Sequence, residues 1–206
     1  VFIQNPIINE LDEMRPSLLP NLLIGAKNNI ARGYGNLALF EAAPEFFGRN
    51  PGEQRAMASG IRVGKTAKKD WTNSMRAYDV FDVKADALAV IAAAKGSIEA
   101  PQITTDAPSY YHPGRSGVIR LGKNVLAYFG ELHPAILKAL DIKTNVMAFE
   151  VFLDNIPLPR DAKSKAKKKL ELSPLQAVDK DLAFVVAHNV SAVSIAAAAK
   201  NADRSN

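Results

Sequence analysis

Apolar side chains alternate with polar or small ones on both sides of a short turn, which predicts a β-hairpin within residues 112–134. Gly122-Lys123-Asn124 is the predicted turn, because Gly and Asn adopt positive φ angles at low cost. His112-Pro113 and His133-Pro134 bound the hairpin, and a short helix is expected over 135–140, because proline disfavours helix at the residue before it. The pattern places Ile119, Leu121, Val125, Ala127 and Phe129 on one face and Val118, Arg120, Leu126 and Tyr128 on the other.

Two longer segments have helical character. After Ser17 an apolar residue recurs at every fourth position, which is typical of an amphipathic helix. Ser17 is its predicted N-cap, Pro20 fits its first turn, and the helix is expected to end near Arg32-Gly33. Residues 79–95 are rich in Ala, Val and Ile and predict a second helix, which Gly96 caps. The periodic positions of the first helix are Leu18, Leu22, Ala26 and Ile30.

Short apolar runs between turn residues predict the strands. They cover residues 1–5, 36–42 with 45–47 continuing the same edge, 54–64, part of 97–106, and 146–153. Residues 65–76 are polar and basic and are expected to form an exposed loop. Strands separated by helices, with hairpins between neighbours, favour an α+β fold with an antiparallel sheet packed by helices.

The last fifty residues differ in composition. Pro157, Pro159 and a lysine run indicate a boundary within residues 155–173. Beyond it we expect a strand over 181–187 and a helix over 191–200 capped by Ser191. The predicted organisation is a core domain over 1–158, a basic linker over 159–173 and the start of a second domain over 174–206.

Composition narrows the class of protein. The chain has 206 residues, 48% of them hydrophobic, and no cysteine. This composition excludes disulfides and thiolate chemistry and favours a cytoplasmic protein. No apolar run approaches the length of a membrane span, no signal-peptide pattern opens the chain, and there is no initial Met, so we expect a fragment of a longer protein.

The net charge of +5 permits a polyanionic partner. Basic side chains gather in two clusters, and the second, which includes Arg160, would attract a phosphate backbone. Trp71 and Tyr78 lie near the first cluster and could stack on bases, although packing at the loop edge is the simpler expectation. The first cluster is Arg62, Lys65, Lys68, Lys69 and Arg76, and the second is completed by Lys163, Lys165, Lys167, Lys168 and Lys169.

The sequence Gly60-Ile61-Arg62-Val63-Gly64-Lys65-Thr66 has features of a phosphate-binding loop. That loop needs four residues between its first glycine and the Gly-Lys pair, whereas here there are three and Ser59 stands at the glycine position. No apolar helix start follows. The context therefore favours a strand that runs into a basic loop.

Other candidate chemistry is sparse. His112 and His133 could bind a metal with Glu131, but no further ligand follows at a usual spacing, and hydrogen bonds from backbone groups are the alternative. The carboxylate pair Asp79 and Asp82 is expected to cap a helix or to be solvated. No serine-hydrolase elbow or zinc-protease motif occurs in the sequence. We therefore expect no catalytic, cofactor-binding or metal-binding residue in this chain.

Several segments together resemble one enzyme family, the beta subunits of bacterial phenylalanine–tRNA ligases, in their C-terminal part. The hairpin with its two His-Pro pairs is the most specific of them. After the linker, residues 178–186 are similar to the start of that subunit's anticodon-binding domain. The other segments are Asn5-Pro6-Ile7, the run from Met14 to Leu23, Leu39-Phe40-Glu41, the run from Tyr78 to Lys84, and the strand 146–152.

The resemblance implies a fold like the catalytic domain of class II aminoacyl-tRNA ligases, followed by a truncated ferredoxin-like domain. It implies a beta subunit that is itself inactive, whereas the alpha subunit makes phenylalanyl-adenylate and charges tRNA(Phe). The implied partners are the alpha subunit, a second beta subunit in an alpha2beta2 assembly, and tRNA(Phe), with ATP and Mg2+ used by the whole enzyme and no cofactor in this part. Ala85 departs from the family, which usually has glycine there.

The class II signatures are incomplete in this chain. Arg15 stands where the second motif would place its ATP-phosphate arginine, but Pro16-Ser17-Leu18-Leu19 replaces the usual substrate-binding residues. The third motif needs a glycine-rich strand and an arginine on the next helix, and Asp154-Asn155-Ile156-Pro157 stands there instead. A non-catalytic scaffold is therefore the favoured hypothesis and a catalytically competent ligase a remote one. The rival is a stand-alone RNA-binding module that uses Lys163, Lys165, Lys167, Lys168 and Lys169.

Overall fold

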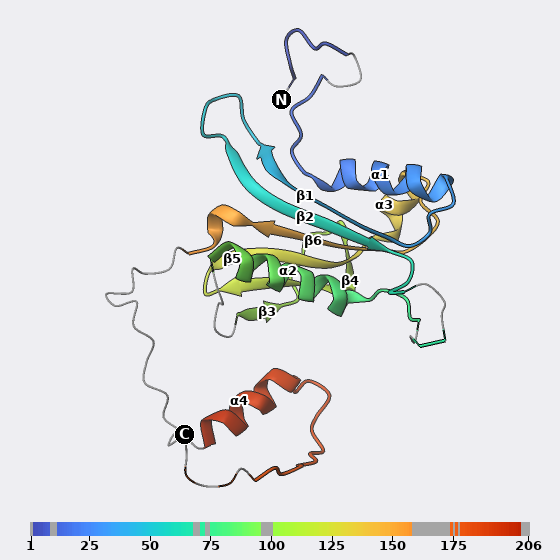
Figure 1. The fold of residues 1–206 in the computed structure, drawn as a ribbon. Coiled ribbons are helices and arrows are strands. Elements are labelled where there is room, and N and C mark those ends of the chain that lie inside the picture. Colours follow the sequence, from blue (N-terminus) through green and yellow to red (C-terminus); the bar gives the residue numbers. More distant parts are fainter. Residues whose placement is uncertain are drawn as a thin grey trace. The chain divides into compact units, whose positions relative to one another are not determined.

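The computed structural model describes residues 2–8, 12–67, 71–72, 75–95, 101–157, 174, 176 and 178–202. The chain divides into two compact units, Val1–Ala162 and Lys163–Asn206, which are described separately below. Figure 1 shows the ribbon, with the sheet of the first unit and a helix of the second.

The first unit is built on a six-stranded antiparallel sheet with the order β1-β2-β6-β5-β4-β3. The sheet confirms the predicted α+β class, and β1 continues through the predicted edge residues as far as Phe46. The strands are β1 (Leu37–Phe46), β2 (Gln54–Val63), β3 (Gln102–Thr104), β4 (Tyr111–Leu121), β5 (Asn124–Leu132) and β6 (Val146–Phe152).

Helices cover both faces of this sheet (Figure 1). The helix α2 (Val80–Lys95) packs on β5 and β6 through Val83, Ala87 and Ile91. On the opposite face lie α1 (Leu19–Ala31) and α3 (Pro134–Ala139). Because both faces are covered, all seven residues of β6 are buried, which explains its continuous apolar character.

Local signals determine where the helices begin. Pro20 lies in the first turn of α1 as predicted, and the Ser17 hydroxyl accepts a hydrogen bond from the Leu19 N–H. At the start of α2, the Asp79 carboxylate accepts from the N–H groups of Phe81 and Asp82, and the Asp82 carboxylate accepts from the Asp79 N–H. This reciprocal arrangement is a capping box, so Asp79 and Asp82 act as the predicted helix cap.

The predicted faces of the central hairpin are wrong on one side of the turn. Ile119 pairs with Ala127 but Arg120 pairs with Val125, so Leu126 is an extra residue in β5. This bulge brings Leu126 onto the α2 face beside Ala127, whereas Val125 packs on the opposite face. The turn itself is shorter than predicted, because Asn124 already pairs with Leu121.

Two predicted strands do not form. Within residues 2–8, only Phe2 makes a β-bridge, an isolated one with Glu13. Residues 181–187 of the second unit are exposed and pair with none of the described residues, and a strand needs a partner for its backbone groups. The helix α4 (Ala192–Ala202) does form, and the Ser191 hydroxyl accepts from the Ser194 N–H as a cap.

Some predictions fall outside the described residues. These include Gly96 and the whole of 158–173, so neither the cap of α2 nor the lysine run can be placed. Among the helices that the structure describes, none combines the length and apolar character needed to span a membrane.

Candidate functional site

Three polar residues lie side by side on the α1 face of the sheet. Ser59 of β2 pairs with Glu41 of β1 on one side and with Glu150 of β6 on the other. Residues directly opposite each other in antiparallel strands point to the same face, so this polar row crosses an otherwise apolar layer. The segment before α1 passes over the row, where Arg15 binds Glu41 at 2.6 Å and the Ser17 hydroxyl donates to Glu150 at 3.3 Å.

Glu150 is almost completely buried and accepts three hydrogen bonds. Besides Ser17, the donors are the hydroxyls of Tyr110, at 2.8 Å, and of Tyr111, at 3.2 Å. Burial raises the pKa of the Glu150 carboxyl, and nearby Glu45 raises it further, while the hydroxyl donors counteract the shift. Burial and the charge of Glu150 also raise the pKa of both tyrosines, which therefore remain protonated donors.

Glu45 is the second buried carboxylate, with 1% of its surface exposed. One of its oxygens accepts from the Leu18 N–H at 3.1 Å, and the other accepts from Nε and Nη2 of Arg55 at 3.2 and 3.1 Å. The Arg55 guanidinium also lies over the Phe152 ring, 4.8 Å from its centroid. Glu45 is therefore fully satisfied by a cation and a backbone donor.

Both carboxylates line a cavity of about 540 Å³ between the sheet, α1 and α3. Most of its wall is apolar, and its polar groups are Glu45, Glu150, Arg55, Tyr110 and Ser17. Among the described residues, Arg55 is the only cation of the wall, and it is already bound to Glu45. With two carboxylates and one committed guanidinium, the cavity would repel a phosphate group. The apolar part of the wall consists of Pro16, Leu19, Pro20, Leu23, Leu132, Ile136, Ala139 and Leu140.

The segment from Gly60 to Thr66, which has features of a phosphate-binding loop in sequence, is a strand followed by a turn. β2 runs through Val63, and Gly64 then turns with a φ of 83°. The Lys65 N–H donates to the side chain of Asn36, and Lys65 forms an isolated bridge with Ala77. None of the described residues 64–67 and 71–72 is helical, which agrees with a strand that runs into a loop.

His112 and His133 accept hydrogen bonds from backbone N–H groups, which is the alternative to a metal site that the sequence left open. His112 Nδ1 accepts from the Gly114 N–H, and His133 Nδ1 accepts from the Ala135 N–H, each at 3.1 Å. Glu131 instead binds Arg115 through two contacts of 2.5 and 3.0 Å. Across the described part of the chain, no three His, Asp or Glu side chains are grouped so as to hold a metal ion.

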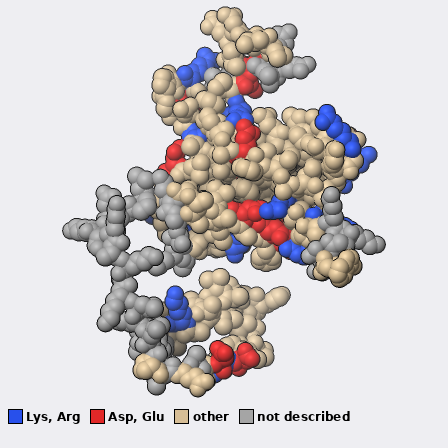
Figure 2. Space-filling model, viewed as in Figure 1, with Lys and Arg blue, Asp and Glu red and all other residues tan. Residues whose placement is uncertain are grey.

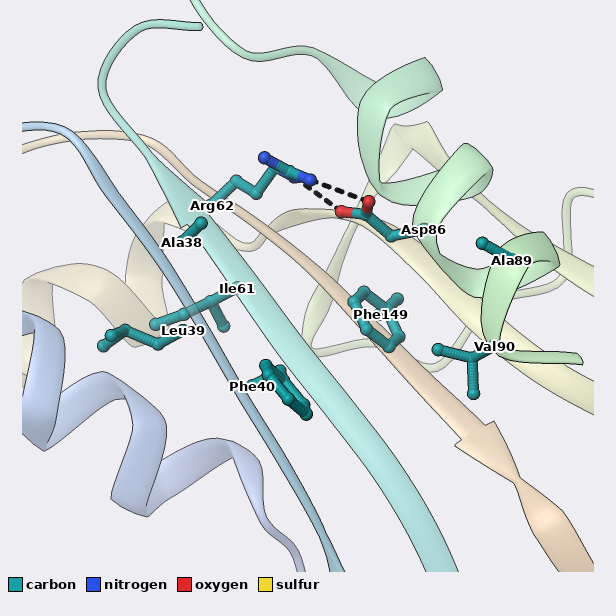
Figure 3. Close-up of a pocket in the computed structure, with 9 residues that line it drawn as sticks. All are labelled: Ala38, Leu39, Phe40, Ile61, Arg62, Asp86, Ala89, Val90 and Phe149. Carbon is teal, nitrogen blue, oxygen red and sulfur yellow. Dashed lines mark hydrogen bonds and ion pairs between the residues drawn. The ribbon is translucent and has the colours of Figure 1, made fainter. Parts of the chain in front are cut away.

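A second hollow lies on the other face of the sheet, between β1, β2 and α2 (Figure 3). At one end the Arg62 guanidinium binds both oxygens of Asp86, at 2.5 and 2.8 Å, and lies over the Tyr78 ring. The rest of this groove is apolar, with Phe40 and Phe149 among its walls. Figure 2 shows that charged side chains gather over α2, while uncharged residues predominate over β1 and β2.

Sequence reasoning missed the residues that make the cavity. Tyr110, Glu45 and Glu150 are far apart in the chain, and only the strand register brings them together. A signal was present, because Glu150 interrupts an apolar run of eight residues. The five lysines predicted to contact nucleic acid, Lys163, Lys165, Lys167, Lys168 and Lys169, lie outside the described residues.

Comparisons with known proteins agree with one another. Residues 1–153 match the family described as "Phenylalanyl tRNA synthetase beta chain CLM domain". The phenylalanine–tRNA ligase beta subunit of Rhodospirillum rubrum is 50% identical over 202 residues, covering 98% of this chain and 25% of that relative. The same subunit of Cereibacter sphaeroides is 47% identical over 204 residues, covering 99% of this chain and 25% of the relative. The chain thus spans about a quarter of the length of the curated relatives it matches.

A solved structure shows a similar fold. The pyrrolysyl-tRNA synthetase of Desulfitobacterium hafniense superposes with a TM-score of 0.52 at 16% identity. The superposition covers 69% of this chain and 48% of that one. At this identity the similarity is one of fold alone.

Proposed function

The chain belongs to the phenylalanyl-tRNA synthetase beta chain family, and on that basis we propose that it is a non-catalytic scaffold of a phenylalanine–tRNA ligase. The whole ligase would charge tRNA(Phe) with phenylalanine at the expense of ATP, with Mg2+. The catalytic steps would take place on an alpha subunit. The proposed location is the cytoplasm, and the proposed assembly contains two alpha and two beta subunits.

The charge of the cavity on the α1 face is the observation that carries this proposal. Amino-acid activation needs cationic groups that stabilise the triphosphate in the transition state. Arg55, the only cation that the described residues contribute to the cavity wall, is held by the buried Glu45. Arg15, the residue in the position of the second motif, is held by Glu41. Neither guanidinium is free to bind a phosphate without losing its carboxylate.

The residues of strand β6 also support a non-catalytic role. In a class II enzyme this strand would be glycine-rich, whereas here Glu150 and Phe152 project from it toward the α1 side and are buried. Their side chains take up room beside the sheet that a glycine would leave open. A short 3₁₀ turn, Leu153–Asn155, follows β6, and no helix with an arginine lies among the residues described up to 157.

The proposal also includes the division of the chain into domains. Residues 1–158 would be the inactive catalytic-like domain, 159–173 a basic linker, and 174–206 the start of a ferredoxin-like anticodon-binding domain. The second unit contributes α4, while its predicted strand is unpaired among the described residues. Further chain would have to supply the strands that bury its apolar side chains.

An exchange assay tests the scaffold role. The isolated chain is incubated with ATP, phenylalanine and labelled pyrophosphate. Two reference samples contain the alpha subunit of the same organism, either by itself or together with its full-length beta subunit. We expect label in ATP at background level for the isolated chain, and co-purification of the chain with the alpha subunit. The proposal would be contradicted if the isolated chain transferred label from pyrophosphate to ATP and the Arg15→Ala substitution abolished this transfer.

The lysine run favours one alternative, a stand-alone RNA-binding module. Five lysines within residues 163–169 would release several counterions from a phosphate backbone, so binding would weaken steeply with salt. Filter binding of tRNA over a salt series, with a variant carrying Gln at all five positions, separates the two. If the isolated chain bound tRNA tightly and the variant did not, the result would favour the RNA-binding module.

A further inference from the structure

Glu150 differs from the other buried carboxylates of the first unit in its partners. Glu45 binds Arg55 and Glu131 binds Arg115, so a guanidinium compensates each of these two charges. Glu150 accepts only hydroxyl groups, and no ion pair among the described residues includes it. A buried carboxylate without a cation is unfavourable, because its charge has left water without compensation.

One oxygen of Glu150 has capacity for a further hydrogen-bond donor. Its Oε2 accepts from the hydroxyls of Tyr110 and Tyr111, at 2.8 and 3.2 Å. Its Oε1 accepts, among the described residues, from the Ser17 hydroxyl alone, at 3.3 Å. Since a carboxylate oxygen can accept about two hydrogen bonds, Oε1 retains one acceptor position. Glu150 also lines the cavity on the α1 face, so a donor inside the cavity has access to this side chain.

The rest of the cavity determines what kind of donor fits beside Glu150. Aliphatic and proline side chains of α1, β5 and α3 form most of the wall, among them Leu23, Leu132 and Ile136. The cavity volume of about 540 Å³ lies within the range of small-molecule sites, about 300–1,000 Å³. An apolar ligand body would gain by leaving water for this wall, so the cavity favours a molecule with one polar end.

We propose that this cavity binds a small primary amine, with its ammonium group on Glu150 and its hydrocarbon body against the apolar wall. An ammonium group brings N–H donors together with the positive charge that Glu150 lacks. Glu45 adds to the attraction, because Arg55 balances only one of the two carboxylates that line the cavity. The ligand thus completes the ion pair that the chain leaves unformed among its described residues.

The same charges disfavour two related classes of ligand. An amino acid would bring a further carboxylate into a cavity that already holds two, and Arg55, which could receive it, is bound to Glu45. A neutral alcohol could donate to Glu150 but would leave the charge of this carboxylate uncompensated. The proposed ligand is therefore an amine without an acidic group. This inference goes beyond the scaffold role and does not rest on it.

The first experiment compares three ligands that share one hydrocarbon body. Isothermal titration calorimetry of the whole chain at pH 8 measures the affinities of cyclohexylmethylamine, cyclohexylmethanol and cyclohexylglycine. The amine should bind at least about tenfold more tightly than the alcohol or the amino acid, since a hydrogen bond between charged groups is stronger than a neutral one. An amine that does not bind, or that binds no more tightly than either of the other two, would overturn the inference.

The second experiment locates the ammonium group. Glu150→Gln removes the charge at nearly constant size and should weaken amine binding by about tenfold or more, while the affinity for the alcohol stays unchanged. Glu131→Gln is the matched control, because Glu131 is equally buried but does not line the cavity, and it should leave amine binding unchanged. Amine binding that survives Glu150→Gln, or that both substitutions weaken equally, would overturn the inference.

A third variant locates the hydrocarbon body and does not alter a buried charge. Ala139 lines the cavity but is exposed, so Ala139→Trp should fill part of the cavity without disturbing the core. This variant should lose at least about tenfold in affinity for both the amine and the alcohol, because the indole ring takes the place of the ligand. Unchanged amine affinity in Ala139→Trp would place the ligand elsewhere and overturn the inference. None of these outcomes depends on the proposed ligase role, which the exchange assay tests separately.

Discussion

Ser59 and Glu150 lie directly opposite each other in the β2–β6 register, yet the buried Ser59 hydroxyl makes no hydrogen bond with any residue that the structure describes. Glu150 takes its donors from Ser17, Tyr110 and Tyr111 instead. A buried polar group without a partner costs free energy in the folded state. The polar row is therefore satisfied at Glu150 and unsatisfied at Ser59, so removing the Ser59 hydroxyl and removing a hydroxyl donor to Glu150 should have opposite effects on stability.

Replacing Ser59 by Ala should leave the free energy of unfolding unchanged or raise it by up to about 1 kcal/mol, because it removes an unsatisfied hydroxyl. Ser17→Ala is the matched control. It removes the acceptor for the Leu19 N–H and a donor to Glu150, and should cost about 1 kcal/mol. Urea unfolding of both variants measures the difference. A cost at Ser59 as large as that at Ser17 would show that Ser59 has an important partner.

The contribution of Glu150 to the stability of the first unit should be lost as pH rises from 4.5 through the raised folded-state pKa of this carboxyl. Burial raises the folded-state pKa of this carboxyl above the ordinary value of 4.5. The folded state then binds the proton more tightly than the unfolded state, so deprotonation favours unfolding. Glu150→Gln should remove this slope in urea unfolding measured from pH 4 to pH 8. An unchanged slope in the variant would assign the dependence to another group.

Asp82 should contribute the opposite dependence at lower pH. Its hydrogen bond with Arg76 holds the pKa of the Asp82 carboxyl below 3.8, so its stabilisation is present above the unfolded value and is lost as pH falls through the folded value. Asp82→Asn should cost about 1 kcal/mol at pH 7, since it weakens the capping box. The cost should shrink below pH 3 in unfolding curves. A constant cost would mean that the carboxylate charge does not matter.

Gly130 should not tolerate a side chain. Its φ is 149°, and a Cβ atom there would lie 2.5 Å from the Ser116 Cα and 2.6 Å from the Arg115 carbonyl oxygen. Because these are backbone atoms, Gly130→Ala should destabilise the chain by about 3 kcal/mol or more. Gly114→Ala is the control, since its Cβ would meet only His112 at 3.8 Å. Thermal unfolding should separate the variants clearly, and equal melting temperatures would contradict the geometry.

The spacing of apolar residues along the chain was sufficient to predict most helices and strands, because each of them buries one face at fixed intervals. The spacing after Ser17 specifies α1, the alternation over 54–64 specifies β2, and the apolar run over 146–153 specifies β6. Capping chemistry is equally local, so Asp79 and Ser191 could be recognised as helix starts. The family resemblance likewise depends on neighbouring residues and could be read from the chain alone.

Tertiary structure decided everything that depends on a partner strand. The bulge at Leu126, the unpaired segment 181–187 and the place of β1 at one end of the sheet follow from which strands are hydrogen-bonded, and periodicity carries no information on that choice. The cavity depends on the same pairing, since Glu45, Tyr110 and Glu150 meet only after the sheet has formed. The sequence by itself determined which residues form α1, α2, β2 and β6, because their periodic or continuous apolar positions are local. Only the folded sheet determined which carboxylates share a cavity and which backbone groups remain free, because hydrogen bonds between strands join residues that are distant along the chain.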